Sequence, residues 1–245
     1  MEAIFTKNLS KKFSIYEESP TIFNILTNFR YFSQKQKFYA LKNINFSIAR
    51  GDRIGLIGSN GSGKTTLLRV LAGIYDKTAG SININGKIAA LLNSQATLER
   101  NLSALENIFL FGMIMGIPKT KLQSNLKEIV HFAGIGKFLH SPLRDFSTGM
   151  VQRLAFAILR YVEADIILID EIFASSDLSF RINYLKALKK FFKPTQTIII
   201  SSHEMDLIEK FCNKALLLDN GQLIAYGPTK KIINLYQRSQ QKISE

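Results

Sequence analysis

The octapeptide GSNGSGKT, residues 58–65, constrains the fold of this chain more than any other stretch. It follows an apolar run with the character of a strand, RIGLI at 53–57, and precedes a run typical of a helix, TTLLRVLAGI at 65–74. This order fits the pattern G-x-x-x-x-G-K-[ST], in which glycines let backbone N–H groups turn toward a phosphate. The pattern predicts a phosphate-binding loop between a strand and a helix.

Every residue of this loop is a candidate for contact with a nucleotide. Lys64 is expected to reach the terminal phosphates, and the hydroxyl of Thr65 is expected to bind Mg²⁺. The other candidates are Gly58, Ser59, Asn60, Gly61, Ser62, Gly63 and Thr66. A chance glycine-rich turn could share this composition, but the strand before it and the helix after it favour the functional interpretation.

The rest of the chain alternates short strand-like runs with helical ones, which predicts an α/β fold. The predicted strands are 43–48, 53–58, 165–170, 197–202 and a hairpin over 215–227. Asn220 and Gly221 supply the positive-φ turn of that hairpin. Helical runs begin near Gly63, within 102–139 and at Gly149, and the block of about 100–160 is expected to be an inserted helical subdomain.

Two carboxylates, Asp170 and Glu171, stand at the end of the apolar run IILID at 166–170. Asp170 is expected to hold Mg²⁺ directly or through water, and Glu171 to position and deprotonate the attacking water. An acidic pair after a strand is more often a solvated loop, but the phosphate loop in the same chain favours catalysis. His203 follows the predicted strand at 197–202, and such a lone histidine is usually structural.

The stretch DFSTGM, residues 145–150, precedes a second apolar helical run. Ser147, Thr148 and Gly149 would open that helix, and the first N–H groups of a helix are unpaired and attract anions. The same residues also suit an ordinary helix cap, so the local sequence leaves both interpretations open.

The composition excludes some classes of protein. No apolar run reaches the roughly 18 residues of a membrane-spanning helix, and a single cysteine excludes an internal disulfide. The formal net charge of +13 suggests a polyanionic neighbour, although a lysine-rich surface with no partner is about equally consistent. Residues 19–51 contain no Asp or Glu.

Taken together, these motifs resemble the ATP-binding subunit of ATP-binding cassette (ABC) transporters, from IFTKNLSKKF at 4–13 to NGQLIAYG at 220–227. DFSTGM, a helix, IILIDE, SSDL and SSH follow one another at spacings specific to that family. The resemblance implies a P-loop NTPase ABC-cassette fold with a mixed sheet core and an inserted helical subdomain. It also implies a single nucleotide-binding domain over 1–245.

The resemblance further implies that ATP and Mg²⁺ are the cofactors and that two copies pair head to tail on binding ATP. Ser147, Thr148 and Gly149 would then contact the γ-phosphate held by the other copy's loop. His203 looks like the switch histidine at the γ-phosphate. Asp177 resembles the loop that crosses the dimer.

Two family positions have alternatives in this sequence. Gln95 looks like the glutamine that senses Mg²⁺ and the transmembrane partner, and Asn93 is the other possible register. Phe13 aligns with the aromatic residue that stacks on adenine, and Tyr39 is the alternative.

The form FSTGM is similar to that of bacterial exporters of O-antigen, capsule and teichoic acid. This implies an ATPase subunit that powers export of a lipid-linked polysaccharide, peripheral on the cytoplasmic face of the inner membrane. A separate transmembrane permease would be its partner, and nucleic acid would not. The alternatives are a soluble ABC ATPase acting on nucleic acid and the ATPase of a small-solute transporter.

An extra helix is predicted over about 19–33. Ser19 suits an N-cap and Pro20 the first helical position. The apolar residues at helical spacing are Ile22, Ile25, Leu26, Phe29 and Phe32. The resemblance implies that this helix serves the export pathway, and the alternative is that it packs on its own domain.

Overall fold

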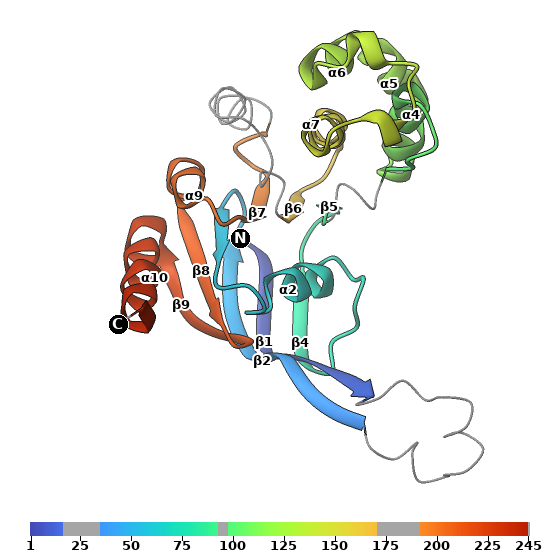
Figure 1. The fold of residues 1–245 in the computed structure, drawn as a ribbon. Helices are drawn as coiled ribbons and strands as arrows, with labels where there is room; N and C mark the ends of the chain where they lie inside the picture. Colours follow the sequence, from blue (N-terminus) through green and yellow to red (C-terminus); the bar gives the residue numbers. More distant parts are fainter. Residues whose placement is uncertain (17–34, 93–97, 171–191, 245) are drawn as a thin grey trace, which may run out of the picture.

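The computed structural model describes residues 1–16, 35–92, 98–170 and 192–244, in two sheets with helices around them (Figure 1). A three-stranded antiparallel sheet has the order β2-β1-β4, and a six-stranded sheet has the order β5-β6-β7-β3-β8-β9. The strands are β1 (Glu2–Tyr16), β2 (Lys35–Ala49), β3 (Arg53–Ile57), β4 (Ala79–Ile84), β5 (Ile88–Leu91), β6 (Ile166–Asp170), β7 (Thr197–Ser201), β8 (Lys214–Asp219) and β9 (Gln222–Pro228).

The six-stranded sheet is mixed, because β5, β6, β7, β3 and β8 pair in parallel and β9 pairs antiparallel to β8. Every residue of β6 and β7 is buried, as expected for apolar strands covered on both faces. Asn220 and Gly221 have φ values of 45° and 74°, which confirms the predicted hairpin turn. The α/β class and the mixed sheet core are confirmed.

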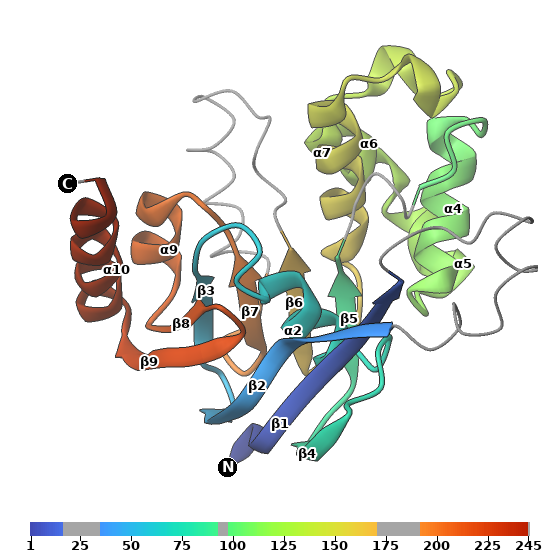
Figure 2. The same cartoon turned by 60° about the horizontal axis from the view of Figure 1, so that its bottom comes forward.

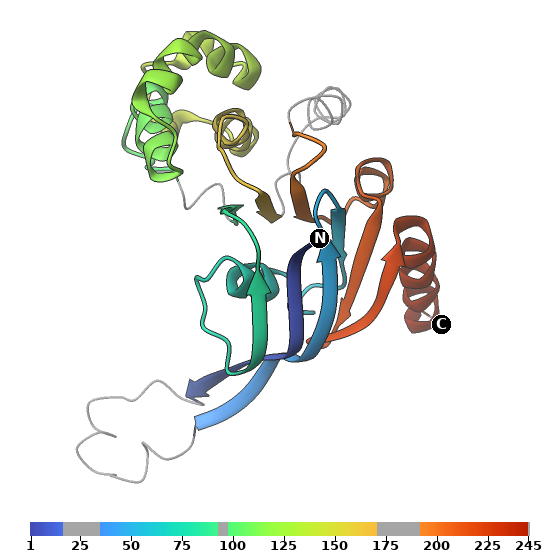
Figure 3. The ribbon, with the colours of Figure 1, turned by 180° about the vertical axis from the view of Figure 1, so that it is seen from behind.

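The helices divide between the sheets and one end of the molecule. They are α2 (Lys64–Leu71), α4 (Ala104–Ile114), α5 (Lys119–Ser124), α6 (Leu126–Ala133), α7 (Thr148–Leu159), α9 (Met205–Phe211) and α10 (Thr229–Ser244), with 3-10 turns at Gly136–Phe138 and Leu143–Asp145. Figures 1 and 3 show α4 to α7 gathered together beyond β5 and β6, while α9 and α10 flank β8 and β9. Within the described residues, no helix combines the length and the apolarity needed to cross a bilayer.

Helix α2 lies between the two sheets (Figure 2). Its buried residues Leu67, Leu68 and Leu71 share a core cluster with Ile4 and Leu9 of β1, and with residues of β3 and β6. The loop that precedes α2 is therefore fixed on both sides by buried apolar contacts.

Helix α4 begins with a complete capping box. The Ser103 hydroxyl accepts from the Glu106 backbone N–H at 3.2 Å, and the Glu106 carboxylate accepts from the Ser103 N–H at 2.8 Å. One turn later, the fully buried Asn107 donates to the carbonyls of Glu99, Leu102 and Ser103. These bonds fix where the chain enters the group of helices α4 to α7, which we call the helical group.

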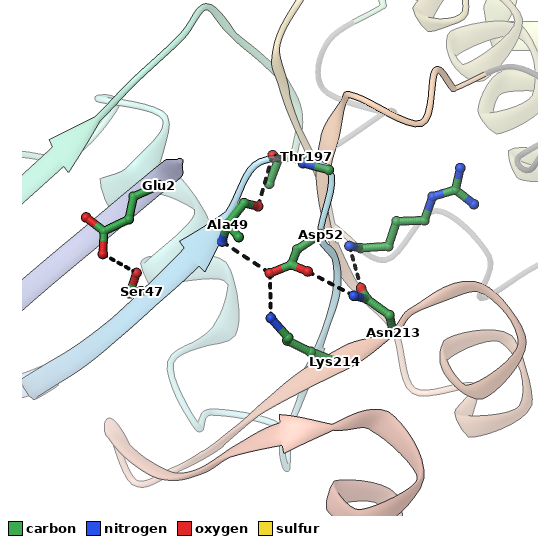
Figure 4. A network of polar contacts seen from close by, with 9 residues as sticks. Glu2, Ser47, Ala49, Asp52, Thr197, Asn213 and Lys214 are labelled. Atoms are coloured by element: carbon green, nitrogen blue, oxygen red, sulfur yellow. Dashed lines mark hydrogen bonds and ion pairs between the residues drawn. The ribbon is translucent and has the colours of Figure 1, made fainter.

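A polar network holds the start of β3, the strand that carries the phosphate loop (Figure 4). The buried Asp52 carboxylate accepts from Ala49 N at 3.1 Å, from Lys214 Nζ at 2.8 Å and from Asn213 Nδ2 at 2.9 Å. Asn213 Oδ1 in turn accepts from Arg53 N at 2.7 Å. Burial raises the pKa of the Asp52 carboxyl, but the hydrogen bonds from Lys214, Asn213 and Ala49 outweigh burial and leave that pKa below its ordinary value.

The single cysteine, Cys212, is buried directly after α9 with only 6% of its surface exposed. Burial raises the pKa of its thiol well above the ordinary value. Its carbonyl accepts a hydrogen bond of 2.8 Å from the Thr229 hydroxyl at the start of α10.

Candidate functional site

The phosphate loop turns sharply between the end of β3 and the start of α2. Gly63 has a φ of +106°, and a Cβ atom there would lie 2.7 Å from the carbonyl oxygen of Ala40. Gly58, with a φ of +155°, would bring a Cβ to 2.6 Å from the Ser62 hydroxyl. Both positions therefore need glycine, for backbone conformation and for close approach.

Lys64 is the first residue of α2 and is 5% exposed. Its ammonium donates to the carbonyl oxygens of Gly58 at 2.8 Å and of Ser59 at 2.9 Å. These two bonds hold the positive charge inside the curl of the loop. The Ser62 hydroxyl is buried there and has no hydrogen-bond partner among the described residues.

A cavity of about 520 Å³ opens beside the loop. Of the residues that the sequence places in the site, those lining the cavity are Phe13, Asn60, Gly61, Gly63, Lys64, Thr65 and Thr66. Gly58, Ser59 and Ser62 do not line the cavity, and the carbonyls of Gly58 and Ser59 accept from the Lys64 ammonium. A cavity with a buried cation, backbone N–H groups and the Thr65 hydroxyl fits the phosphates of a nucleotide and an accompanying Mg²⁺.

The sequence did not indicate four further residues that line the cavity, Phe38, Ala40, Asn220 and Gly221. Gly221 N donates to Ser62 O at 3.0 Å, and Gly221 O accepts from Lys42 N at 2.7 Å. The Asn220-Gly221 turn was recognisable as a hairpin turn. Its contact with the phosphate loop depends on the order of the strands, which the sequence does not state.

Both aromatic candidates for adenine stacking line the cavity. The Phe13 ring stacks on Phe38 with centroids 5.7 Å apart and meets Tyr75 edge-on at 5.5 Å. The Tyr39 ring is 50% exposed, with Lys12 Nζ 4.9 Å from its centroid. Phe13 is thus held by other rings, whereas Tyr39 keeps much of its surface open to a ligand.

Asp170 and His203 lie at the same edge of the six-stranded sheet as the phosphate loop. Asp170 ends β6, is 8% exposed and pairs in register with Ser201 of β7. Ser201 pairs on its other side with Leu56 of β3, one residue before that strand ends. Because parallel strands end together, the Asp170 carboxylate and the exposed His203, two residues after β7, belong to the edge that bears the loop.

Ser147 and Thr148 are exposed at the start of α7, away from this cavity. Ser147 is the N-cap, and its hydroxyl accepts from Met150 N at 3.3 Å. Gly149 is buried in the first turn. Among the described residues that line the cavity, none comes from α7. Within one copy the start of α7 is therefore separate from this cavity.

Several predicted residues lie outside the described residues. They are Gln95 and its alternative Asn93, Glu171, Asp177 and the helix over about 19–33. Their roles stay predictions from the sequence.

The family is decided by comparison with known proteins. A family model described as "ABC transporter" matches residues 41–174 of this chain. The chain belongs to the ABC transporter family. It is an ATPase cassette of that family, and ATP is its nucleotide.

The chain is similar to ATP-binding proteins of two kinds of export system. The chain is 34% identical over 204 residues to the O-antigen export system ATP-binding protein RfbB of Klebsiella pneumoniae, covering 83% of each chain. It is 36% identical over 240 residues to the teichoic acids export ATP-binding protein TagH of Bacillus anthracis, covering 98% of this chain and 43% of TagH. The chain thus spans less than half of TagH.

The ABC fold is also found among solved structures. A dimeric ATP-binding cassette in a post-hydrolysis state with ADP and phosphate has a TM-score of 0.74 and 21% identity. The likeness covers 92% of this chain and 98% of that one. The predicted ABC-cassette fold is confirmed.

Proposed function

We propose that this chain is the ATP-hydrolysing subunit that powers export of a lipid-linked polysaccharide, of O-antigen, capsule or teichoic-acid type. The observation that carries the proposal is the cavity around Lys64, in a chain that resembles RfbB and TagH over most of its length. The polymer would cross the cytoplasmic membrane through a separate permease. The chain itself would sit on the cytoplasmic face.

The chemistry assigns a role to each group at the edge of the sheet. Lys64 and the loop N–H groups would bind and orient the terminal phosphates. The Thr65 hydroxyl and the Asp170 carboxylate would supply oxygen ligands to Mg²⁺, and Gln95 would add a third. Bound Mg²⁺ would neutralise charge that develops on the transferred phosphoryl group.

Proton transfer would fall to the residues after β6 and β7. Glu171, next to Asp170, would accept the proton of the attacking water. His203 would contact the γ-phosphate from the end of β7 and hold that water in line. Phe13 or Tyr39 would cover the adenine ring.

We further propose that 1–245 acts as one nucleotide-binding domain whose helical subdomain contains α4 to α7. Two copies would pair so that Ser147, Thr148 and Gly149 of one reach the phosphates held by the other. The separation of α7 from the cavity within one copy supports this arrangement. A likeness to a dimeric cassette agrees with it, and Asp177 would lie at the crossing.

The test of hydrolysis is Glu171→Gln, which preserves the shape of the side chain and removes the base. ATP binding should persist, while hydrolysis should fall by at least about 100-fold, the usual contribution of a general base. Glu209→Gln, on the exposed face of α9, is the matched control and should hydrolyse ATP normally. A wild-type rate for Glu171→Gln would remove Glu171 from the mechanism.

The test of export uses cells that lack the gene for this chain. Wild-type protein should restore the polymer to the cell surface, and Lys64→Ala should not. The tagged chain should also co-purify with a polytopic membrane protein. Normal surface polymer without the chain would contradict the export role and leave its ATPase activity standing.

A further inference from the structure

A second cavity, of about 880 Å³, lies at the other edge of the six-stranded sheet. Lys87 immediately precedes β5, Asp165 precedes β6 and Gln196 precedes β7, and all three line it. These strands are parallel, so their amino ends face away from the edge that carries the phosphate loop. We call this the rear cavity.

Basic side chains dominate the rear cavity. Its cationic lining residues are Arg50, Lys87, Lys121, Arg160 and Lys193. Glu163 and Asp165 are its acidic lining residues, which leaves a surplus of three positive charges. The chain therefore concentrates part of its net positive charge in a concave site.

The two acidic groups already have partners in the protein. Glu163 forms an ion pair of 2.7 Å with Lys121, and this bond, with the fields of Lys193 and Lys87, holds the pKa of Glu163 below its ordinary value. Asp165 accepts from the backbone N–H of Lys87 at 2.8 Å. Neither carboxylate is a close ion-pair partner, within the described residues, for the ammonium groups of Lys87 and Lys193.

The backbone fixes where Lys87 stands. Both Asp165 N and Ile166 N donate to Lys87 O, at 2.9 and 3.1 Å. Gly86 before it has a φ of +141°, and a Cβ there would lie 2.6 Å from the Cβ of Asp165. The Lys87 ammonium reaches across to the loop after α4, where it lies 3.5 Å from the position of a Cβ on Gly116.

The cations come from both parts of the molecule. Lys121 is on α5 and Arg160 follows α7, in the helical group. Each of these two cations has an ion pair, Lys121 with Glu163 and Arg160 with Glu128 at 3.2 Å, whereas Lys87 and Lys193 precede strands of the sheet. Arg50 follows β2 and donates to Asn85 O at 3.2 Å, which leaves other guanidinium N–H groups for a ligand. An anion with several charged groups could contact both parts at once.

We propose that the rear cavity binds a small multivalent phosphate anion, separate from the ATP that the phosphate loop holds. Its volume lies within the roughly 300–1,000 Å³ typical of small-molecule sites. Lysine and arginine are the side chains that recognise phosphate oxygens, by charge-assisted hydrogen bonds. A bound anion would tie the helical group to the sheet and thereby regulate how they move.

The test uses calorimetric titration of inorganic tripolyphosphate in buffer free of divalent cations. All proteins carry Lys64→Ala, so that the phosphate loop does not compete. The expected result is saturable binding that weakens by at least about tenfold in Lys87→Gln/Lys193→Gln, because two charge-assisted contacts are lost. Lys87→Arg/Lys193→Arg should restore it to within about threefold.

The matched control is Lys230→Gln/Lys231→Gln, which removes the same charge from the exposed start of α10, at the far end of the sheet (Figure 1). It should leave the affinity unchanged. Equal weakening in both glutamine pairs would mean diffuse surface charge and would overturn the site. With Lys64 intact, both pairs should keep the wild-type melting temperature and basal ATPase rate.

A second arm separates a soluble phosphate from a lipid head group. Flotation with vesicles of phosphatidylglycerol and phosphatidylcholine in equal parts tests the lipid source. Binding of tripolyphosphate without vesicles assigns a soluble ligand, and vesicle binding that Lys87→Gln/Lys193→Gln abolishes assigns a head group. Absence of both would overturn the proposal.

Discussion

At the scale of single residues, the phosphate loop needs the missing Cβ atom of Gly63 as much as it needs the side chain of Lys64. Gly63 allows the loop to pass Ala40, which belongs to β2, more closely than a residue with a Cβ atom could. The Lys64 ammonium can then bend back to the carbonyls of Gly58 and Ser59. The position of the buried positive charge therefore depends on the backbone conformation at Gly63.

Gly63→Ala should therefore weaken nucleotide binding by at least about tenfold, because the strained loop must shift away from Ala40. Gly73→Ala is the control, since Gly73 has a similar φ of +73° but open space around it. Titration with a fluorescent ATP analogue measures the difference. Equal affinities in the two variants would show that the approach to Ala40 does not shape the loop.

Removal of the Asp52 side chain should lower the stability of the fold. Asp52→Ala leaves the Lys214 ammonium and the Asn213 amide without their partner, and should lower the free energy of unfolding by about 2–3 kcal/mol. Chemical denaturation at pH 7 measures this value. Glu2→Ala removes an exposed carboxylate that accepts from Ser47, and should cost less than about 0.5 kcal/mol.

The same carboxylate predicts a pH dependence. Its folded-state pKa lies below the unfolded value, so its contribution is present above about pH 4 and is lost as the pH falls through the folded pKa. Wild-type protein should lose this stability in acid. Asp52→Ala should show a correspondingly flatter profile below pH 4, and parallel profiles would contradict the assignment.

At the scale of elements, the capping box of α4 sets the start of the helical group. Ser103→Ala should cost about 1 kcal/mol of stability, because the Glu106 N–H loses its acceptor and the Glu106 carboxylate loses the Ser103 hydroxyl as a donor. Ser103→Asp, which can still cap, should stay near wild type. Thermal unfolding followed by circular dichroism compares the two.

The strands also show how much of the fold could be predicted from the sequence. β3, β6 and β7 were predictable because each is a short run of buried apolar residues beside a motif, and the Asn220-Gly221 turn because of its φ preference. β1, β4 and β5 were not among the predicted strands. β1 is interrupted by polar residues and register shifts, no residue of β4 is buried, and β5 has only four residues, so none of them is the continuous buried apolar run that marked β3, β6 and β7.

The candidate site also contains residues that the sequence predicted and residues that it did not. Lys64, Thr65 and Asp170 could be placed from local spacing, whereas Ala40, Asn220 and Gly221 lie in the cavity wall because β8 pairs beside β3. Pairing between strands far apart in sequence depends on tertiary packing. A single sequence does not state which distant strands pair.

At the scale of the whole molecule, the proposed pairing of two copies would let the start of α7 in one copy complete the ATP cavity of the other. Mixing Lys64→Ala with Ser147→Arg chains should form some heterodimers that have one intact composite site. ATP hydrolysis should reappear in the mixture, while each variant alone stays inactive. Recovery would exclude a site within one subunit.

The control for this experiment mixes two preparations of the same variant at equal total concentration. Neither should regain activity. If ATP hydrolysis instead proceeds in Ser147→Arg alone at the wild-type rate, the start of α7 takes no part in the reaction.

The burial of Cys212 makes the chain a natural background for site-directed spectroscopy. The thiolate is the form that attacks thiol-directed reagents, so a thiol that is both shielded and hard to ionise reacts slowly. A cysteine introduced on the surface would carry a spin label or fluorophore without first removing Cys212. Pairs of probes at exposed positions of α7 and α10 could then follow, in real time, how the helical group moves when ATP or a rear-cavity anion is added.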